Sequence, residues 1–234
     1  MTFNSLRLFD YRKVALYRNK VAEINRSFGL FYAGRYNDAP ANNESDFQRA
    51  VVYLERARDE AEPDVSISAN GDLGVLFVGR SEIEESESSK ASMRRLAESY
   101  FALVLERNKT EPKSLLGLAW IQKRDGRLRD AIASATRVIE KREWQEQERI
   151  RYLRKAYFNR ACYLVLARES GQGTETTANF WSAMQDLHAS RVLALKHGQF
   201  NDWLIDLERE LKASGDLAAL QPEYGPKLDE MRRS

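Results

Sequence analysis

The chain has 234 residues, of which 43% are hydrophobic and 31% are charged. A chain of this length and hydrophobicity can bury the core of one or two domains, which excludes an intrinsically disordered protein. Its 37 Lys and Arg residues nearly balance 35 Asp and Glu residues, and the resulting formal charge of +2 argues against a protein that mainly binds phosphate backbones.

The single cysteine, Cys162, excludes an internal disulfide framework and any site held by several cysteines. The first twenty residues carry basic side chains but no continuous apolar stretch of the kind found in signal peptides. The longest apolar runs, LGVLFVG and ACYLVLA, are far shorter than the ~20 residues of a membrane helix. These features predict a soluble, cytoplasmic protein with no membrane insertion.

The first predicted element is a helix over residues 5–20, which places Leu6, Tyr11, Val14 and Tyr17 at helical spacing. The next predicted helix lies around NRSFGLFY, residues 25–32, and is followed by a helix in DFQRAVVYLERARDEAEPD. Two further helices are expected around DLGVLF and MRRLAESYFALVLERNKTEP. Pro63 and Pro112 punctuate this series, because proline ends one helix and turns the chain into the next.

The clearest helix pair lies in residues 114–140. Apolar residues recur at helical spacing before and after the segment RDGR, which predicts two antiparallel helices joined by a tight turn. Gly126 supplies the backbone freedom of that turn, and Glu111 and Pro112 suit the first turn of the first helix. Small residues at Ala119 and Ala131 allow the helix axes to approach closely.

This pair resembles a tetratricopeptide repeat, a helical hairpin of ~34 residues. One pattern recurs in the second helix of each predicted pair. A small residue is followed four positions later by a large residue, and three positions after that by another packing residue. It occurs at Ala50, Leu54 and Ala57, at Ala97, Phe101 and Val104, and at Ala183, Leu187 and Ser190. First-helix partners follow the same logic: Phe28, Gly29 and Tyr32; Leu73, Gly74 and Phe77; Tyr157, Ala161 and Leu164.

The resemblance implies an all-α fold, a right-handed α-solenoid of about four hairpins with a capping helix at each end. The N-terminal cap is assigned to residues 1–21 and the repeats to 22–198, divided into 22–63, 64–112, 113–147 and 148–198. Residues 199–234 hold the C-terminal cap, a helix over 200–213, and a tail. Segments 35–45, 80–90 and 168–179 are predicted to be solvated insertions between paired helices.

No pattern in the sequence indicates catalysis, so the chain is predicted not to be an enzyme and to need no metal or cofactor. His188 and His197 are expected on different faces and read as surface residues. Cys162, in an apolar helix, is interpreted as a small core or groove residue. The acidic run in residues 82–88 lacks a calcium-loop pattern and is interpreted as solvated, with docking of a basic partner or a metal as the alternative.

In this family the first helices line a concave groove, so the resemblance implies that binding residues lie on their free faces. Trp120 is the expected anchor, because an aromatic side chain beside Lys or Arg is typical of binding hot spots. Packing under a neighbouring segment is the alternative for Trp120. The full predicted set is Arg26, Leu30, Asp72, Lys113, Leu116, Trp120, Lys123, Arg124, Lys155, Phe158 and Asn159.

The predicted function is a non-catalytic scaffold or adaptor that binds a protein or peptide with an acidic and apolar motif in this groove. One alternative is a regulatory or sensory subunit of an effector complex that binds through its insertions. Another is an RNA-binding helical repeat that uses the basic and aromatic residues of 149–160.

Overall fold

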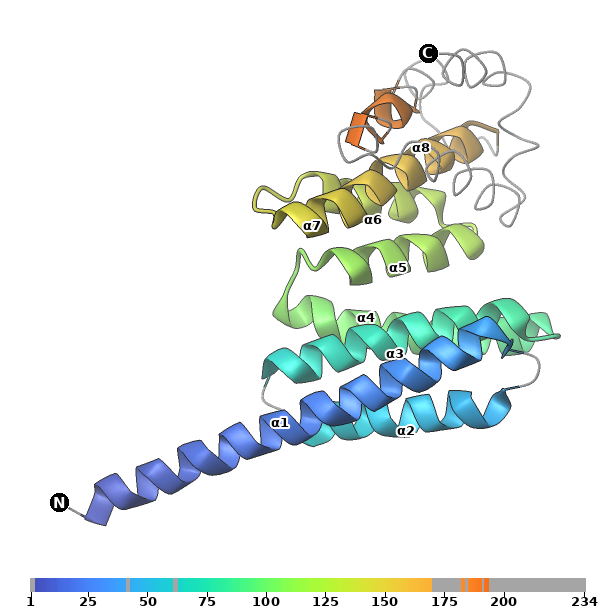
Figure 1. The fold of residues 1–234 in the computed structure, drawn as a ribbon. Coiled ribbons are helices and arrows are strands. Elements are labelled where there is room, and N and C mark those ends of the chain that lie inside the picture. The colour runs from blue at the N-terminus through green and yellow to red at the C-terminus, as the bar shows by residue number, and fades with distance from the viewer. Residues whose placement is uncertain are drawn as a thin grey trace. The chain divides into compact units, whose positions relative to one another are not determined.

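The computed structural model describes residues 3–40, 43–60, 63–169, 182–183, 185–190 and 192–193 (Figure 1). Throughout these ranges the regular structure is helical and no strand is present, which confirms the all-α class. The chain divides into two compact units, Met1–Gly117 and Leu118–Ser234.

The first unit contains α1 (Phe3–Asp38), α2 (Glu44–Glu60), α3 (Pro63–Ile83), α4 (Glu87–Arg107) and the first turns of α5 (Pro112–Arg124). Helix α1 packs against α2 and α3 packs against α4, and contacts of α3 with α1 and α2 join the two hairpins (Figure 1). Consecutive helices therefore pair as the sequence pattern predicts for this part of the chain.

The helix ends follow local sequence signals. Pro63 and Pro112 are the first residues of α3 and α5, where a missing backbone N–H costs nothing. The Glu111 carboxylate accepts hydrogen bonds from the backbone N–H groups of Lys113, at 3.2 Å, and Ser114, at 2.6 Å. These bonds satisfy two donors at the start of α5, as expected of a residue just before a helix.

Small residues set the packing distance between helices of the first unit. Ala50, Leu54 and Ala57 of α2 are fully buried, as the repeat pattern predicts. At Gly74 and Gly117 an added Cβ would come within 2.4 Å and 2.3 Å of the Phe101 ring, so only glycine fits at either position. The fully buried Phe101 thus locks α4 against α3 and the start of α5.

The second unit contains the rest of α5, α6 (Leu128–Ile139), α7 (Glu146–Glu148), a π-helical turn (Arg149–Leu153) and α8 (Arg154–Glu169). Gly126, in the turn between α5 and α6, has φ of +75°, which confirms its predicted role. Helix α6 packs against α8, and the described parts of 182–193 are also helical. The predicted packing residues of α6 and of the described parts of 182–193 are buried: Ala131, Ala135, Val138, Ala183, Leu187 and Ser190.

Two predictions about the N-terminal half are wrong. Residues 5–20 and 25–32 do not form two helices, because α1 runs without a break from Phe3 to Asp38. The sequence offers no Gly or Pro between residues 5 and 28 that would favour a break. Phe28, assigned to the packing pattern of the first hairpin, stacks on Tyr53 of α2 but remains 49% exposed.

The predicted insertion over residues 80–90 is also wrong. Helix α3 continues to Ile83 and α4 begins at Glu87, so only Glu84–Ser86 connect them. Ser86 caps α4 by accepting a hydrogen bond from the backbone N–H of Ser89 at 3.0 Å, and the Arg80 guanidinium pairs with Glu84 one turn further along the chain. Glu and Ser in this segment therefore stabilise helix ends, although the same residues are common in loops.

The connection predicted at 35–45 is present in shorter form, between Asp38 and Glu44. The third predicted insertion, 168–179, lies outside the described residues beyond Glu169, as do His197, the predicted helix 200–213 and the tail. In the described part of the chain, no helix is both long enough and apolar enough to cross a bilayer. The same residues contain no group of His, Cys, Asp or Glu side chains placed to hold a metal ion.

Candidate functional site

The predicted binding residues are divided between the two units. Arg26 and Leu30 lie on α1, Asp72 on α3, and Lys113 and Leu116 on the part of α5 that belongs to the first unit. The second unit carries the others: Trp120, Lys123, Arg124, Lys155, Phe158 and Asn159.

Three predicted residues of the first unit meet in a charged cluster that joins α1, α3 and α5. The Arg26 Nε–H donates to Asp72 Oδ2 at 2.6 Å. The Lys113 ammonium donates to Asp72 Oδ1 at 2.7 Å. We call Arg26, Asp72 and Lys113 the cross-helix cluster.

Burial explains why this cluster has its composition. The Asp72 side chain is only 8% exposed, and a carboxylate removed from water to this degree is stable only when its oxygens are paired. Both oxygens accept a charged donor. The two cations are less buried, with side-chain exposures of 34% for Arg26 and 24% for Lys113, so they reach solvent with a combined excess of one positive charge.

Gly71 leaves the space through which the Lys113 side chain reaches Asp72. A Cβ added at Gly71 would lie 3.0 Å from Lys113 Cε and 3.2 Å from Nζ, so the lysine side chain runs along the backbone of α3 at this point. Any larger residue at position 71 would have to displace the lysine. The position of the ammonium group is therefore fixed from two sides, by Gly71 and by Asp72.

Two buried polar atoms without hydrogen-bond partners lie close to the cluster in sequence. Asn70 precedes Asp72 by two positions and is 7% exposed, and its Oδ1 is unpaired. Ser114 follows Lys113, is fully buried, and has an unpaired Oγ. A buried polar group without a hydrogen-bond partner costs about 1–3 kcal/mol, so a polar ligand atom or a water molecule that paired with it would be stabilising.

The two leucines predicted for the same surface have different environments. Leu30 is 43% exposed and lies one helical turn from Arg26, so it can offer an apolar contact beside the cluster. Leu116 is 8% exposed and belongs to the core. Its side chain is used in packing and offers little surface to a partner.

In the second unit, the structure pairs Trp120 with Arg124. The guanidinium carbon lies 5.1 Å from the centre of the indole ring, within the range of a cation–π contact, and Trp120 is half-buried. Lys155 is exposed and Asn159 half-buried, and Lys123 is half-buried on α5. Phe158, at 7% exposed, packs in the core and offers little surface to a partner.

Replacing Trp120 with alanine is expected to weaken partner binding while leaving most of the stability in place, because the ring is only half-buried. The measurement is the affinity for a selected peptide together with the midpoint of thermal unfolding. Unchanged affinity accompanied by a large loss of thermal stability would instead assign Trp120 to the core.

In the basic segment 149–160, considered for RNA binding, Arg160 is paired with an acidic residue of the same chain. The Arg160 guanidinium donates from Nε and Nη2 to the two carboxylate oxygens of Asp186, both at 2.7 Å, and from Nη1 to Thr136 Oγ1 at 3.1 Å. The hydrogen bond to Asp186 raises the pKa of Arg160 above its ordinary value. Arg160 therefore ties α8 to α6 and to the helical segment at 185–190.

A second charged group lies around Arg80, near the C-terminal end of α3 and the N-terminal end of α2. Arg80 pairs with Glu44 and Glu84, and its guanidinium carbon lies 5.0 Å from the centre of the Phe47 ring. Burial alone would lower the pKa of Arg80, but hydrogen bonds to the two carboxylates raise it above its ordinary value. Burial also raises the pKa of Tyr36, which is 1% exposed nearby. These groups hold helix ends together.

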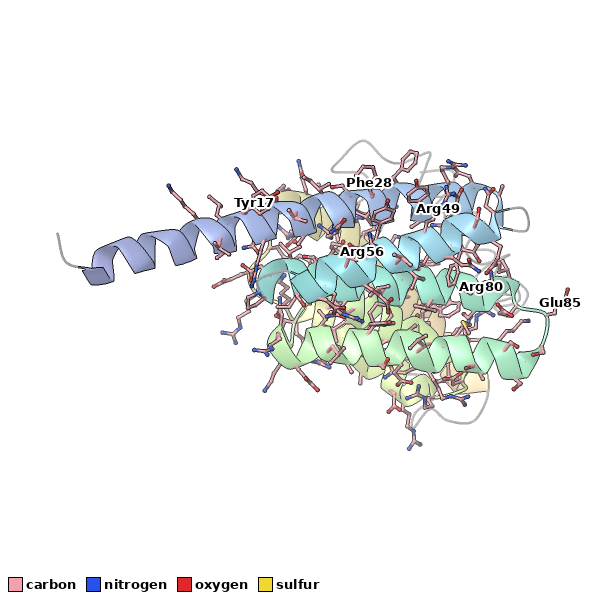
Figure 2. The ribbon with its side chains drawn as sticks, turned by 90° about the horizontal axis from the view of Figure 1, so that it is seen from below. Tyr17, Phe28, Arg49, Arg56, Arg80 and Glu85 are labelled. Atoms are coloured by element: carbon pink, nitrogen blue, oxygen red, sulfur yellow. The ribbon has the colours of Figure 1, made fainter. Side chains whose placement is uncertain are left out.

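The sequence prediction missed a group of aromatic and arginine side chains on α1 and α2. Tyr53 stacks with Phe28 at a ring distance of 5.4 Å and with Tyr32 at 5.7 Å. Arg49 lies over Tyr32 and Arg56 lies over Tyr53, and Figure 2 shows Phe28 on α1 with both arginines on α2. The signal was present as aromatic residues at helical spacing in both segments, but pairing across helices cannot be read from either segment alone.

Comparison with known proteins adds no family assignment. No protein-family model matches the chain, and neither the curated proteins nor the solved structures give a match. The class that the structure defines is an all-helical protein whose described helices pack against their neighbours.

Proposed function

We propose that the chain is a non-catalytic protein-interaction module of about four tetratricopeptide-like hairpins. In this proposal a peptide or protein partner binds in a groove lined by the first helix of each hairpin. The paired packing of α1 with α2 and α3 with α4 supports the hairpin part of the proposal. The burial of the repeated small and large residues in their second helices supports it as well.

The cross-helix cluster is the observation that carries the binding part of the proposal. It joins α1, α3 and α5, the helices that come first in their hairpins. Asp72 holds the two cations in fixed positions, so they are ordered before a ligand arrives, and ordering in advance lowers the cost of binding. Their excess positive charge favours an acidic group on the partner.

The surroundings of the cluster define the rest of the partner motif. Leu30, exposed one turn from Arg26, favours an apolar side chain next to the acidic group. The unpaired atoms of Asn70 and Ser114 add polarity beneath the same region. An acidic residue adjacent to Leu, Ile or Phe is therefore the motif expected in a partner peptide.

The two alternatives receive less support from the described residues. A regulatory subunit that binds through its insertions would use segment 80–90, which forms helix ends around a connection of only Glu84–Ser86. An RNA-binding surface over 149–160 would use Arg160, which is engaged with Asp186 and Thr136. We therefore keep the groove as the proposed binding surface.

The experiment that tests the proposal is selection of a random peptide library against the full chain, followed by fluorescence anisotropy with the enriched peptides. The peptides should carry Asp or Glu beside an apolar residue. Arg26→Gln and Lys113→Met should each weaken their binding about tenfold. Arg95→Ala, which removes an exposed cation from α4, is the matched control and should leave affinity within about twofold.

Enriched peptides without acidic residues, or equal losses in the cluster and control variants, would contradict the proposal. Thermal unfolding of each variant separates weaker binding from loss of the fold. Gln retains N–H donors that can reach Asp72, so Arg26→Gln should leave the carboxylate partly paired.

A further inference from the structure

Helix α1 carries an exposed row of apolar side chains on a face that the cross-helix cluster does not use. The row repeats at alternating intervals of three and four residues, the spacing that keeps side chains on one side of a helix that pairs with another helix. Its members, which we call the apolar stripe, are Val14, Tyr17, Val21, Ile24, Phe28 and Phe31.

Most of the stripe is exposed to solvent, although Val21 is half-buried and the Phe28 ring stacks on Tyr53 of α2. Tyr17 is 71% exposed, Ile24 56% and Phe31 57%, values far above those of packed residues of the same kind. Ile24, Phe28 and Phe31 also line one hollow on the surface of α1. A contiguous exposed apolar surface of this length on a folded protein indicates an interaction site.

The stripe and the cluster lie on different faces of α1. With about 100° per residue, Phe28 is about 200° around the helix from Arg26. A third face, marked by Ala22, Gly29 and Tyr36 at intervals of seven residues, is buried in the first unit. Helix α1 therefore packs through one face, contributes Arg26 to the cluster with a second, and exposes the apolar stripe on a third.

Among the described helices, α2 and α3 pack on α1 through its buried face, and the apolar stripe lies on a different face. The sequence predicted a separate capping helix over residues 5–20, but these residues continue α1 in a straight line. Figures 1 and 2 both show the part of α1 that carries Tyr17 extending past α2. An exposed apolar face at the end of a helical array favours docking of another polypeptide.

Charges beside the stripe limit what that polypeptide can be. Lys13, Arg18 and Lys20 flank its N-terminal half, and residues 11–22 contain no acidic residue; the hollow further along is lined by one basic and one acidic residue, Lys20 and Glu23. At the other end Arg35 lies over the ring of Phe31, at 5.9 Å from the guanidinium carbon to the ring centre, but its charge is paired with Asp46 at 3.0 Å, so the basic flank is the N-terminal one. Basic side chains at the edges of an apolar seam select a partner helix with acidic side chains at the matching positions.

We propose that the apolar stripe is the docking site for an amphipathic helix of a partner protein, with apolar residues in a heptad pattern and acidic residues on both flanks. A second copy of the chain is a poorer occupant in parallel register, because Lys13 of one copy would lie beside Arg18 of the other. Like the proposed function, this docking site serves protein interaction. It lies on a different surface from the cross-helix cluster and takes a partner of different chemistry.

The test uses a labelled synthetic probe, a helical peptide of about three heptads with Leu at the apolar positions and Glu on both flanks. Fluorescence anisotropy measures its binding to the full chain, with a peptide carrying Lys in place of Glu as the comparison. The acidic probe should bind, and the basic probe should bind at least about tenfold more weakly. Ile24→Asp should weaken the acidic probe about tenfold, since it places a charge in the centre of the stripe.

Leu103→Asp is the matched control, because Leu103 on α4 is 46% exposed and lies outside the stripe. It should leave binding of the acidic probe unchanged. The combined variant Lys13→Glu, Arg18→Glu and Lys20→Glu should reverse the preference from the acidic to the basic probe. Thermal unfolding of all variants checks that the fold is retained.

Three results would overturn the inference. The first is equal binding of both probes, or equal losses in Ile24→Asp and Leu103→Asp. The second is a wild-type dimer in sedimentation equilibrium that Ile24→Asp dissociates, which would assign the stripe to a second copy. The third is binding to anionic phosphatidylserine vesicles, lost in Ile24→Asp, with no binding of either peptide. Unchanged binding of the selected peptides by the Arg26→Gln and Lys113→Met variants would contradict the groove proposal without affecting this one.

Discussion

Replacing Phe101 with alanine is expected to lower the free energy of unfolding by about 3–5 kcal/mol, among the largest effects of any single change in the first unit. The ring is fully buried and fills the space above Gly74 and Gly117, which come from two different helices. Truncation leaves a cavity that neither helix can fill, because both present backbone at this point. Denaturant unfolding followed by circular dichroism measures the change.

Two glycine variants provide the check on this explanation. Gly74→Ala should destabilise the protein by about 1–3 kcal/mol, because its Cβ would fall 2.4 Å from the Phe101 ring. Gly34→Ala, also inside a helix but with no atom within 4 Å of the added Cβ, should stabilise it by about 0.4–1 kcal/mol. Equal effects of the two alanines would show that helix propensity, and not the contact with Phe101, determines the outcome.

Replacing Asp186 with alanine is expected to cost about 3 kcal/mol, the second large effect. The Asp186 side chain is 5% exposed and receives both arms of the Arg160 guanidinium, whose side chain is 22% exposed. Removing the carboxylate leaves a partly buried positive charge with only the hydroxyl of Thr136 as a described partner. Thermal or denaturant unfolding of the full chain reports the loss.

The double variant Arg160→Met with Asp186→Leu separates the two sources of this cost. It removes both charges and retains apolar volume, so it should be more stable than Asp186→Ala. A double variant that is at least as destabilised as Asp186→Ala would mean that packing around the pair, and not the uncompensated charge, dominates.

Much of the helical core could be predicted from the sequence. The pattern at Ala97, Phe101 and Val104 identified buried residues because helix periodicity is a local property of the chain. Gly126 was predicted for the same reason, since a tight turn between two periodic segments requires unusual backbone angles. Local signals of this kind are sufficient wherever the chain pairs with its immediate neighbour.

The errors concern helix ends and helix faces. Whether residues 80–90 form a loop or helix ends depends on partners such as the Arg80–Glu84 pair and the Ser86 cap, which composition does not reveal. Phe28 was predicted to be buried because its periodicity fits a packed face, but burial also requires another element on that side. Phe28 stacks on Tyr53 of α2 and still leaves half of its surface exposed, and no local pattern distinguishes a packed face from an exposed one.

The candidate site was partly predictable. Arg26, Asp72 and Lys113 were each identified as groove residues from their register on the first helices, but not as a cluster. Their meeting depends on the absence of a side chain at Gly71 and on contacts between residues 41 and 46 positions apart. The aromatic and arginine group on α1 and α2 was missed for the same reason, because its contacts cross between helices.

The central claim is that a partner's acidic group binds at the cross-helix cluster, and a double-mutant cycle across the interface tests it most directly. The measurement compares the affinity of an enriched peptide and its acid-to-amide counterpart for the wild type and for Lys113→Met. The wild type should prefer the acidic peptide about tenfold, and the variant should lose this preference. An equal preference in both proteins would place the acidic group elsewhere and contradict the claim.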